Sequence, residues 1–513
     1  MKSKIADFVK KNKKELVVIG LILLIGAFFR LYKISSYMTF LGDEGRDVII
    51  VRRIFTELHP PLIGPGTSVG DMYLGPLYYY MMAIPLLIAG FSPVGPAVMV
   101  ALLGVATIAF IWWVGRIWFD KKAGLIAAGL YAISPTAIIF AHSSWNPNIM
   151  PFFSILSIYS VWKVWKQKNL NWLIVLGISL AFVLQSHYLG LLLIPTLLLF
   201  WILSLRNLKL IKNSKFEIRN FIKKSLLGFG FFLILMSPLL MFDFRHDFMN
   251  AKAIYKFFIE RQTNFSSSPG SAIFQMPEIF NFINKSLIAG KNSMAAIVSS
   301  VVIAAGITYT FVENFVKRKN LKIKVEYWLL FSWLGFGLIG LGLYKQSIYD
   351  HYLGFLFPVP FILIGVIVSK LMSKNIFAKI IGGAFLIYLI GINFAGSPLR
   401  KEPNRLMRRS MDVSRLVLDN VDGKPFNLAV IAERNYEDGY RYFLELWGGE
   451  VLHADRWNPS TISDQLIVVC ENEPAKCDPT HSPKAEVANF GMTKIDKQWE
   501  VDGVIIYKLV HTQ

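Results

Sequence analysis

The sequence predicts an all-α polytopic membrane domain followed by a small α/β domain. Hydrophobic residues make up 54% of the 513 residues, and apolar runs long enough to cross a bilayer recur along most of the chain. After Phe394 the composition changes, because residues 397–513 are charged and contain no long apolar run. We therefore expect a membrane domain over residues 1–396 and a second domain over residues 397–513.

The apolar runs give about eleven candidate membrane spans. These are residues 16–32, 95–114, 123–140, 149–164, 172–185, 189–205, 226–242, 295–311, 327–343, 353–368 and 378–394. The first run follows a lysine cluster and resembles a signal peptide, but no small-residue cleavage site follows it. We expect it to be a retained first span.

The basic residues indicate which way the chain crosses the membrane. A net charge of +20 would suggest nucleic-acid binding in a soluble protein, but here most lysines and arginines lie in short loops between apolar runs. If the apolar segment 76–91 does not cross, every basic loop lies on the side of the N-terminal lysines. We therefore expect a cytoplasmic N-terminus, a first outer loop over 35–94 that holds 76–91 as an interfacial or re-entrant segment, and an extracytoplasmic C-terminal domain.

The C-terminal part shows the patterns of strands and one helix. Residues 427–433, 465–470 and 503–510 are typical of strands, and 405–420 have the spacing of an amphipathic helix. The only two cysteines, Cys470 and Cys477, could form a disulfide outside the cytoplasm or remain two free thiols.

Two adjacent acidic residues follow the first span. Asp43 and Glu44 lie between Gly42 and Gly45, and acids at the mouth of a membrane helix are costly unless they are solvated, paired or used. A loop turn with solvated acids is the simple alternative. Counting the membrane crossings places the other polar residues at span ends on the same outer side as Asp43. We therefore expect one active cavity there.

Familiar nucleotide and metal motifs are missing from the sequence. Residues 335–340 match Gly-x-Gly-x-x-Gly, but they lie inside a candidate span without the required strand, and no P-loop or zinc-spaced Cys/His array occurs. A polyprenyl-phosphate sugar would bring its own leaving group within the membrane. Such chemistry needs a carboxylate to deprotonate an acceptor hydroxyl, and cations or a metal to stabilise the departing phosphate.

Three segments resemble the GT-C membrane glycosyltransferases. They are Gly42-Asp43-Glu44, the segment 75–80, and Tyr352-Leu353 followed by Pro358. The resemblance covers roughly residues 16–368 and is to the branch of protein O-mannosyltransferases and the aminoarabinose transferase acting on lipid A. It implies inverting transfer of a sugar from a polyprenyl phosphate, with Asp43 as the catalytic aspartate, Glu44 as its partner and Tyr352 near the donor phosphate.

The sequence departs from this family at three points. Leu74-Gly75 stands where the lipid A enzyme has an acidic-basic pair before the proline, which argues against a metal site there. Asn146 stands where relatives often carry an aspartate, so it can hydrogen-bond a sugar but cannot act as a base. The Trp-Trp-Asp-Tyr-Gly signature of oligosaccharyltransferases is absent, which argues against block transfer to asparagine.

These observations give each candidate residue an expected role. We expect Asp43 to be the general base and Glu44 to position it or to bind a divalent metal ion. Candidates for the donor phosphate are Arg52, Arg53, Arg245, Arg261, Lys345 and Tyr352. Candidates for substrate contact are Tyr78, His142, Asn146, His187 and His351. Helix caps, a salt-bridged turn around Arg245 and arginines that snorkel to lipid headgroups are the alternatives.

The expected partners are a polyprenyl-phosphate-linked sugar, a protein, lipid or glycan acceptor, and membrane lipid, with no nucleic acid. A transporter or flippase of lipid-linked glycans is the rival function, although it would be expected to show inverted repeats and ionisable residues at mid-membrane depth. A polysaccharide polymerase or ligase shares the donor chemistry and is a second alternative.

Overall fold

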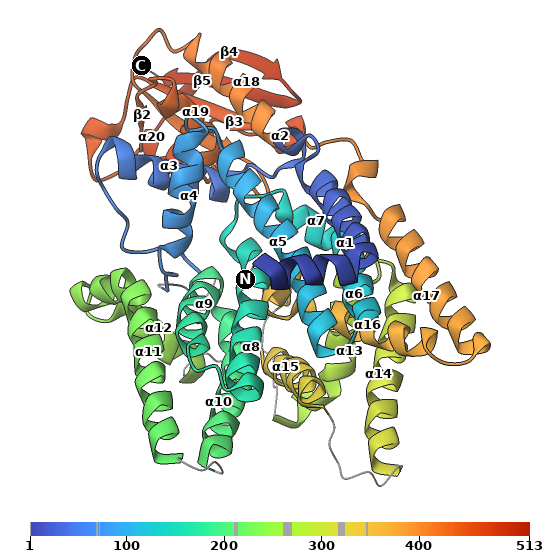
Figure 1. Cartoon of the computed structure of the whole chain (residues 1–513). Helices are drawn as coiled ribbons and strands as arrows, with labels where there is room; N and C mark the ends of the chain where they lie inside the picture. Colours follow the sequence, from blue (N-terminus) through green and yellow to red (C-terminus); the bar gives the residue numbers. More distant parts are fainter. Residues whose placement is uncertain are drawn as a thin grey trace.

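The computed structural model describes residues 2–67, 70, 72–209, 214–259, 269–316, 324–344 and 347–512 (Figure 1). Up to residue 396 the described residues are helical, apart from loops and one isolated bridge between Gly66 and Tyr73. The α-helices are α1 (Lys2–Leu31), α2 (Ile34–Tyr37), α3 (Gly42–Thr56), α4 (Leu77–Ile88), α5 (Val94–Trp118), α6 (Lys121–Ile133), α7 (Pro135–Ala141), α8 (Met150–Gln167), α9 (Trp172–Ser186), α10 (Ile194–Lys209), α11 (Ser214–Arg245), α12 (Met249–Ile259), α13 (Pro269–Leu287), α14 (Ser293–Val316), α15 (Val325–Gly342), α16 (Pro358–Met372) and α17 (Ile376–Ala395).

Helix length and composition make the chain a multi-pass membrane protein. Among the described residues, six helical segments are long and apolar enough to cross a bilayer, and eight if each of two bent pairs is one span. The predicted number of about eleven stays a prediction. Helix α4 has only 12 residues and so extends about 18 Å, well short of a hydrocarbon core about 30 Å thick. This length agrees with the expected interfacial or re-entrant segment.

Several helices are broken near one end of the bundle. Helices α6 and α7 meet at 62°, and the 3₁₀-helix η3 (Asp350–Leu356) meets α16 at 61°. Pro135 and Pro358 begin the second helix of each pair, where the missing N–H costs nothing. The 3₁₀-helices η1 (Asn146–Ile149) and η2 (Tyr188–Leu193) both pack against η3. These breaks bring three polar segments together.

The C-terminal part forms a five-stranded mixed sheet. Its strands are β1 (Phe426–Ile431), β2 (Val451–Leu452), β3 (Gln465–Cys470), β4 (Thr493–Val501) and β5 (Val504–His511), in the order β2-β1-β3-β5-β4. Strand β1 is parallel to β2 and β3, whereas β5 is antiparallel to β3 and β4. Helices α18 (Leu406–Leu418), α19 (Asp438–Leu446) and α20 (Ala485–Phe490) accompany the sheet.

The sequence prediction for this part is confirmed at three strands and one helix. The predicted strands correspond to β1, β3 and β5, and the predicted amphipathic helix to α18. Strands β2 and β4 were not predicted. Cys470 and Cys477 form a disulfide, so the alternative of two free thiols is not observed.

The sheet lies at one end of the molecule, with α3 and α19 close together beneath it (Figure 1). Tyr442 and Phe443 of α19 are buried in the same apolar cluster as Phe40, which precedes α3. The rings of Phe40 and Phe443 lie 5.4 Å apart. The C-terminal part therefore packs directly on the segment that holds Asp43.

Candidate active site

Asp43 and Glu44 lie in the first turn of α3. Leu41 is the extended N-cap residue, and its N–H donates to Glu44 Oε2 at 3.1 Å. Carboxylates in the first turn also interact favourably with the positive end of the helix dipole. The Glu44 side chain is buried, and burial raises its pKa to about 7. Glu44 thus caps the N-terminus of α3.

Asp43 makes two close polar contacts. Its Oδ1 accepts hydrogen bonds from Arg46 Nη1 at 2.9 Å and from the Tyr436 hydroxyl at 2.5 Å. The Asp43 side chain is 45% exposed, so the carboxylate remains open to solvent on its other side. A half-exposed carboxylate held by a guanidinium and a phenol is oriented but still accessible.

Arg46 links Asp43 to a second, buried carboxylate. The Nη2 of Arg46 lies 2.7 Å from Oδ1 of Asp47, which is 0% exposed and also accepts from the Tyr79 hydroxyl at 3.0 Å. Because a buried carboxylate needs a partner, Asp47 fixes the guanidinium and, through it, Asp43.

Two glycines allow the C-terminal part to approach this turn. A β-carbon at Gly42 would collide with the ring of Tyr436, and one at Gly45 would collide with the backbone carbonyl of Asp438. The backbone N–H of Gly42 also donates to Asn435 Oδ1 at 2.9 Å. The glycines that flank Asp43-Glu44 are therefore explained by a contact with residues 435–439.

A cavity of about 250 Å³ opens beside Asp43. Five predicted site residues line it, together with Arg46 and a loop that precedes α4. Its lining residues are Asp43, Arg46, Pro65, Gly66, Thr67, Leu74, Trp145, Asn146, Pro147, His187, Tyr188, His351 and Tyr352. Asp43 and Tyr352, more than three hundred positions apart, thus face one space.

Aromatic and imidazole rings form one wall of this cavity. His187 lies 4.7 Å from the ring of Tyr352, and His351 lies 4.6 Å from the ring of Trp145, measured between ring centroids. Burial lowers the pKa of His187 to about 3, so its imidazole is neutral at physiological pH. Asn146 Nδ2 donates to the Ser186 carbonyl at 2.6 Å and ties η1 to the end of α9.

The residues around Asp43 do not fit a metal site built on Glu44. No group of three His, Cys, Asp or Glu side chains that could hold a metal ion occurs within the described ranges. Glu44 Oε2 is engaged by the N–H of Leu41, and Asp43 Oδ1 is engaged by a cation.

Several predicted residues lie outside this cavity. Arg53 is ten positions, or about 15 Å, along α3 from Asp43, and it contacts Glu57 at 3.4 Å and Glu445 at 3.8 Å. Arg52, beside it, does not line the cavity either.

Tyr78 and His142 make buried contacts within the protein. The Tyr78 hydroxyl lies 2.7 Å from Ser144 Oγ, and His142 Nε2 lies 2.9 Å from the carbonyl of Phe29. Neither side chain lines the cavity. Substrate contact by these two residues stays a prediction.

Of the remaining predicted cations, only Arg245 lies within the described residues. Arg245, at the end of α11, is exposed and does not line it. Arg261 and Lys345 lie outside the described residues. Their role in phosphate binding stays a prediction.

Sequence reasoning missed Arg46 and Tyr436. The spacing of Asp43 and Arg46 is i, i+3 on a helix, which is a usable signal for an ion pair. Tyr436 lies 393 positions from Asp43, and no local pattern in the sequence indicates their contact.

Comparisons with known proteins bear on this architecture. The sequence model of the dolichyl-phosphate-mannose-protein mannosyltransferase family matches residues 74–242. ArnT from Cupriavidus metallidurans, in a structure bound to undecaprenyl phosphate, has a TM-score of 0.59 and 13% identity, covering 97% of this chain and 98% of that one. The oligosaccharyltransferase AglB from Archaeoglobus fulgidus, in complex with an inhibitory peptide and a dolichol-phosphate, has a TM-score of 0.53 and 14% identity, covering 89% and 69%.

The chain has the GT-C fold. The arabinofuranosyltransferase AftD from Mycobacteria has the same fold, with a TM-score of 0.52 and 13% identity over 98% of this chain and 42% of that one. No curated protein sequence matches the chain significantly. These comparisons confirm the predicted GT-C fold.

Proposed function

We propose that this GT-C chain is a membrane glycosyltransferase that moves a sugar from a polyprenyl phosphate to an acceptor hydroxyl. The gathering of Asp43, Arg46, Asn146, His187, His351 and Tyr352 around one cavity carries the proposal. The dolichol-phosphate and undecaprenyl phosphate in the AglB and ArnT structures support the class of donor.

Asp43 is the proposed general base. The acceptor hydroxyl donates its proton to the Asp43 carboxylate while its oxygen attacks the anomeric carbon of the sugar. The bond from that carbon to the phosphate oxygen breaks, and the polyprenyl phosphate leaves with the electron pair. A single displacement of this kind inverts the anomeric configuration. Arg46 orients the Asp43 carboxylate, since its Nη1 donates to Oδ1 at 2.9 Å.

Arg46 and Tyr352 are the proposed contacts for the departing phosphate within the described part of the cavity. A guanidinium and a phenol can both donate hydrogen bonds to phosphate oxygens. Arg261 and Lys345 were predicted for the same role and may be tested in parallel. Asn146 and His187 are both uncharged at neutral pH, so they are less suited to the phosphate than Arg46 is. We propose that they hydrogen-bond the sugar.

The proposed topology follows from the basic loops. With the N-terminus in the cytoplasm, the Asp43 cavity and the C-terminal sheet lie outside it. Residues 435–439 then cover Asp43 from the extracytoplasmic side. Tyr436 donates to the same carboxylate oxygen that Arg46 contacts, so the acceptor hydroxyl must use the other oxygen or displace the phenol.

The test is product formation in membranes that contain the full chain. Membranes are incubated with a panel of radiolabelled polyprenyl-phosphate sugars, and labelled product is measured for wild type, Asp43→Asn and Asp412→Asn. Asp412 is the matched control, because it contacts only surface arginines on α18. We expect Asp43→Asn to lose about 10²- to 10⁴-fold in transfer, as is typical of a lost general base.

Equal product from wild type and Asp43→Asn would remove Asp43 from the mechanism. Product from no donor, combined with movement of a labelled lipid across the membrane, would instead support a flippase. If Asp412→Asn retains activity, the loss in Asp43→Asn is due to that carboxylate and not to the removal of any acidic residue.

A further inference from the structure

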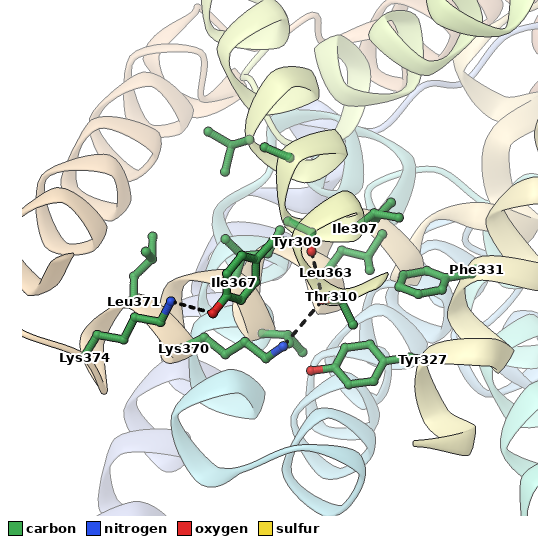
Figure 2. A pocket seen from close by; sticks show the side chains of 14 residues that line it. Ile307, Tyr309, Thr310, Tyr327, Phe331, Leu363, Ile367, Lys370, Leu371 and Lys374 are labelled. Carbon is green, nitrogen blue, oxygen red and sulfur yellow. Dashed lines mark hydrogen bonds between the residues drawn. The ribbon is translucent and has the colours of Figure 1, made fainter. Parts of the chain in front are cut away.

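A second cleft lies at the other end of α16 from Tyr352. It has a volume of about 270 Å³ and is enclosed by the end of α14, the start of α15 and the last turns of α16 (Figure 2). Apolar side chains form most of its wall, among them Ile307, Phe331, Leu363 and Ile367. This volume approaches the lower end of the range of about 300–1,000 Å³ that is usual for small-molecule pockets.

Two lysines and two tyrosines also line this cleft (Figure 2). They are Lys370, Lys374, Tyr309 and Tyr327. Lys374 Nζ lies 3.0 Å from the Tyr309 hydroxyl and 4.3 Å from the centre of its ring. Lys370 Nζ lies 3.5 Å from Thr310 Oγ1 and 4.8 Å from the centre of the Tyr327 ring. Both ammonium groups are thus held next to the apolar space.

The charge around these lysines is positive. Among the described residues, Lys324 and Lys374 add positive charge near Lys370, and Glu313 is its acidic neighbour. Asp120 is a second carboxylate nearby, since it accepts from Ser369 Oγ at 2.7 Å and acts on Tyr327. Three lysines against two carboxylates still leave a net positive charge, which favours an anion. Lysines and tyrosines at helix ends also occur where side chains merely reach the interface, but that alternative does not explain a hollow lined by apolar groups.

We propose that this cleft binds an anionic glycerophospholipid, with its phosphate at Lys370 and Lys374 and an acyl chain along the apolar wall. Basic pockets between membrane helices bind anionic headgroups in this way. Helices α14 and α15 are each long and apolar enough to cross a bilayer, and apolar side chains of α14 such as Val301 and Val312 are exposed, so we expect this side of the cleft to face lipid. By the proposed topology the lipid belongs to the cytoplasmic leaflet. The site does not depend on the transfer reaction, because none of its lining residues lines the Asp43 cavity.

The test is lipid binding to the purified full chain, measured by native mass spectrometry. Dioleoylphosphatidylglycerol and dioleoylphosphatidylcholine are the probes. We expect tighter binding of the anionic lipid by wild type and a loss of about 30-fold in Lys370→Ala/Lys374→Ala. That factor corresponds to about 2 kcal/mol, or about 1 kcal/mol for each lysine. Lys370→Arg/Lys374→Arg should bind as wild type does.

A matched double variant controls for charge alone. Lys223→Ala/Lys379→Ala removes two exposed lysines that do not line the cleft, and it should bind phosphatidylglycerol within about twofold of wild type. Ala305→Trp fills the cleft without changing its charge and should weaken binding about tenfold, in line with about 1.4 kcal/mol of lost burial.

Three binding results would each overturn the proposal: equal binding of the two lipids by wild type, unchanged binding in Lys370→Ala/Lys374→Ala, and an equal loss in Lys223→Ala/Lys379→Ala. Preferential displacement of phosphatidylglycerol by a polyprenyl phosphate would also overturn it, because the cleft would then be a donor site.

Discussion

The cavity beside Asp43 and the cleft beside Lys370 have similar volumes, about 250 and about 270 Å³, but different walls. The first is built from polar segments where helices break, and residues 435–439 pack beside it. The second is built from the ends of three helices and is mostly apolar, with lysines at its side.

This difference has a consequence for stability. Asp43 and Arg46 at the first cavity are paired with each other, and Arg46 is also paired with Asp47, which is fully buried behind it. The lysines of the cleft contact neutral hydroxyls and rings near solvent. Changes at the first site should therefore affect folding and chemistry together, whereas changes at the second should affect only what binds there.

The largest stability effect is expected for Arg46→Ala. It leaves the buried Asp47 carboxylate without its cation, and breaking a buried ion pair costs about 3–5 kcal/mol. Lys374→Ala should cost less than about 1 kcal/mol, because that lysine is exposed. Denaturant unfolding in detergent measures both. Arg46→Met/Asp47→Leu should recover most of the loss, and a cost below about 1 kcal/mol for Arg46→Ala would contradict the comparison.

A smaller effect is expected for Gly45→Ala. The added methyl group meets the Asp438 carbonyl, and overpacking of this kind costs about 1–3 kcal/mol. Gly383→Ala in α17 is the matched control, since a β-carbon there meets nothing within 4 Å. It should be neutral or stabilising by up to about 1 kcal/mol. Equal melting temperatures for the two variants would show that residues 435–439 do not pack closely against Gly45 of α3.

Tyr436→Phe should change kinetics as well as stability. The phenol donates to the Asp43 carboxylate, and a charged hydrogen bond contributes about 1.5–3 kcal/mol. Without it, the Asp43 carboxylate is freer to accept a hydrogen bond from the acceptor hydroxyl. We expect the KM for the acceptor to fall about tenfold, near the lower end of the factor to which that free energy corresponds. Initial rates at varied acceptor concentration measure it, and an unchanged KM would exclude competition at Asp43.

The last effect concerns the pH dependence of stability. Burial raises the pKa of Glu44 to about 7 from a model-peptide value of 4.5, so the folded chain keeps this proton to a higher pH than the unfolded chain does. The free energy of unfolding should therefore fall as the pH rises from about 4.5 to 7. Glu44→Gln should flatten this slope while keeping an acceptor for the Leu41 N–H. A slope that is the same in both proteins would refute the assignment.

Local patterns predicted much of this architecture. The sequence indicated Asp43, Asn146, His187, His351 and Tyr352 as polar residues at the ends of apolar runs, with the family resemblance as a second guide, and all five line one cavity. Apolar runs rich in β-branched residues identified β1, β3 and β5. Strand β4 was missed because most of its side chains are exposed and its sequence carries no continuous apolar run.

Contacts between distant segments could not be predicted in this way. Tyr436 reaches Asp43 across 393 positions, and the glycines beside Asp43 are explained only once residues 435–439 are seen against them. Arg52 and Arg53 were chosen by sequence proximity, but the rise of α3 carries them about 15 Å from Asp43, whereas Arg46 is one turn away. The lysines of the cleft were interpreted only as a sign of membrane topology. The cleft beside them is formed by three helices and has no local pattern in the sequence.

The central claim is that Asp43 and Tyr352 share one cavity and one lipid headgroup on the same side of the membrane. Asp43→Cys and Tyr352→Cys can be labelled separately with a membrane-impermeant thiol reagent in sealed vesicles of known orientation, because the two native cysteines are joined in a disulfide. We predict that both positions are labelled from the extracytoplasmic side and that polyprenyl phosphate slows labelling at both. Labelling from opposite sides, or protection of only one position, would contradict the account.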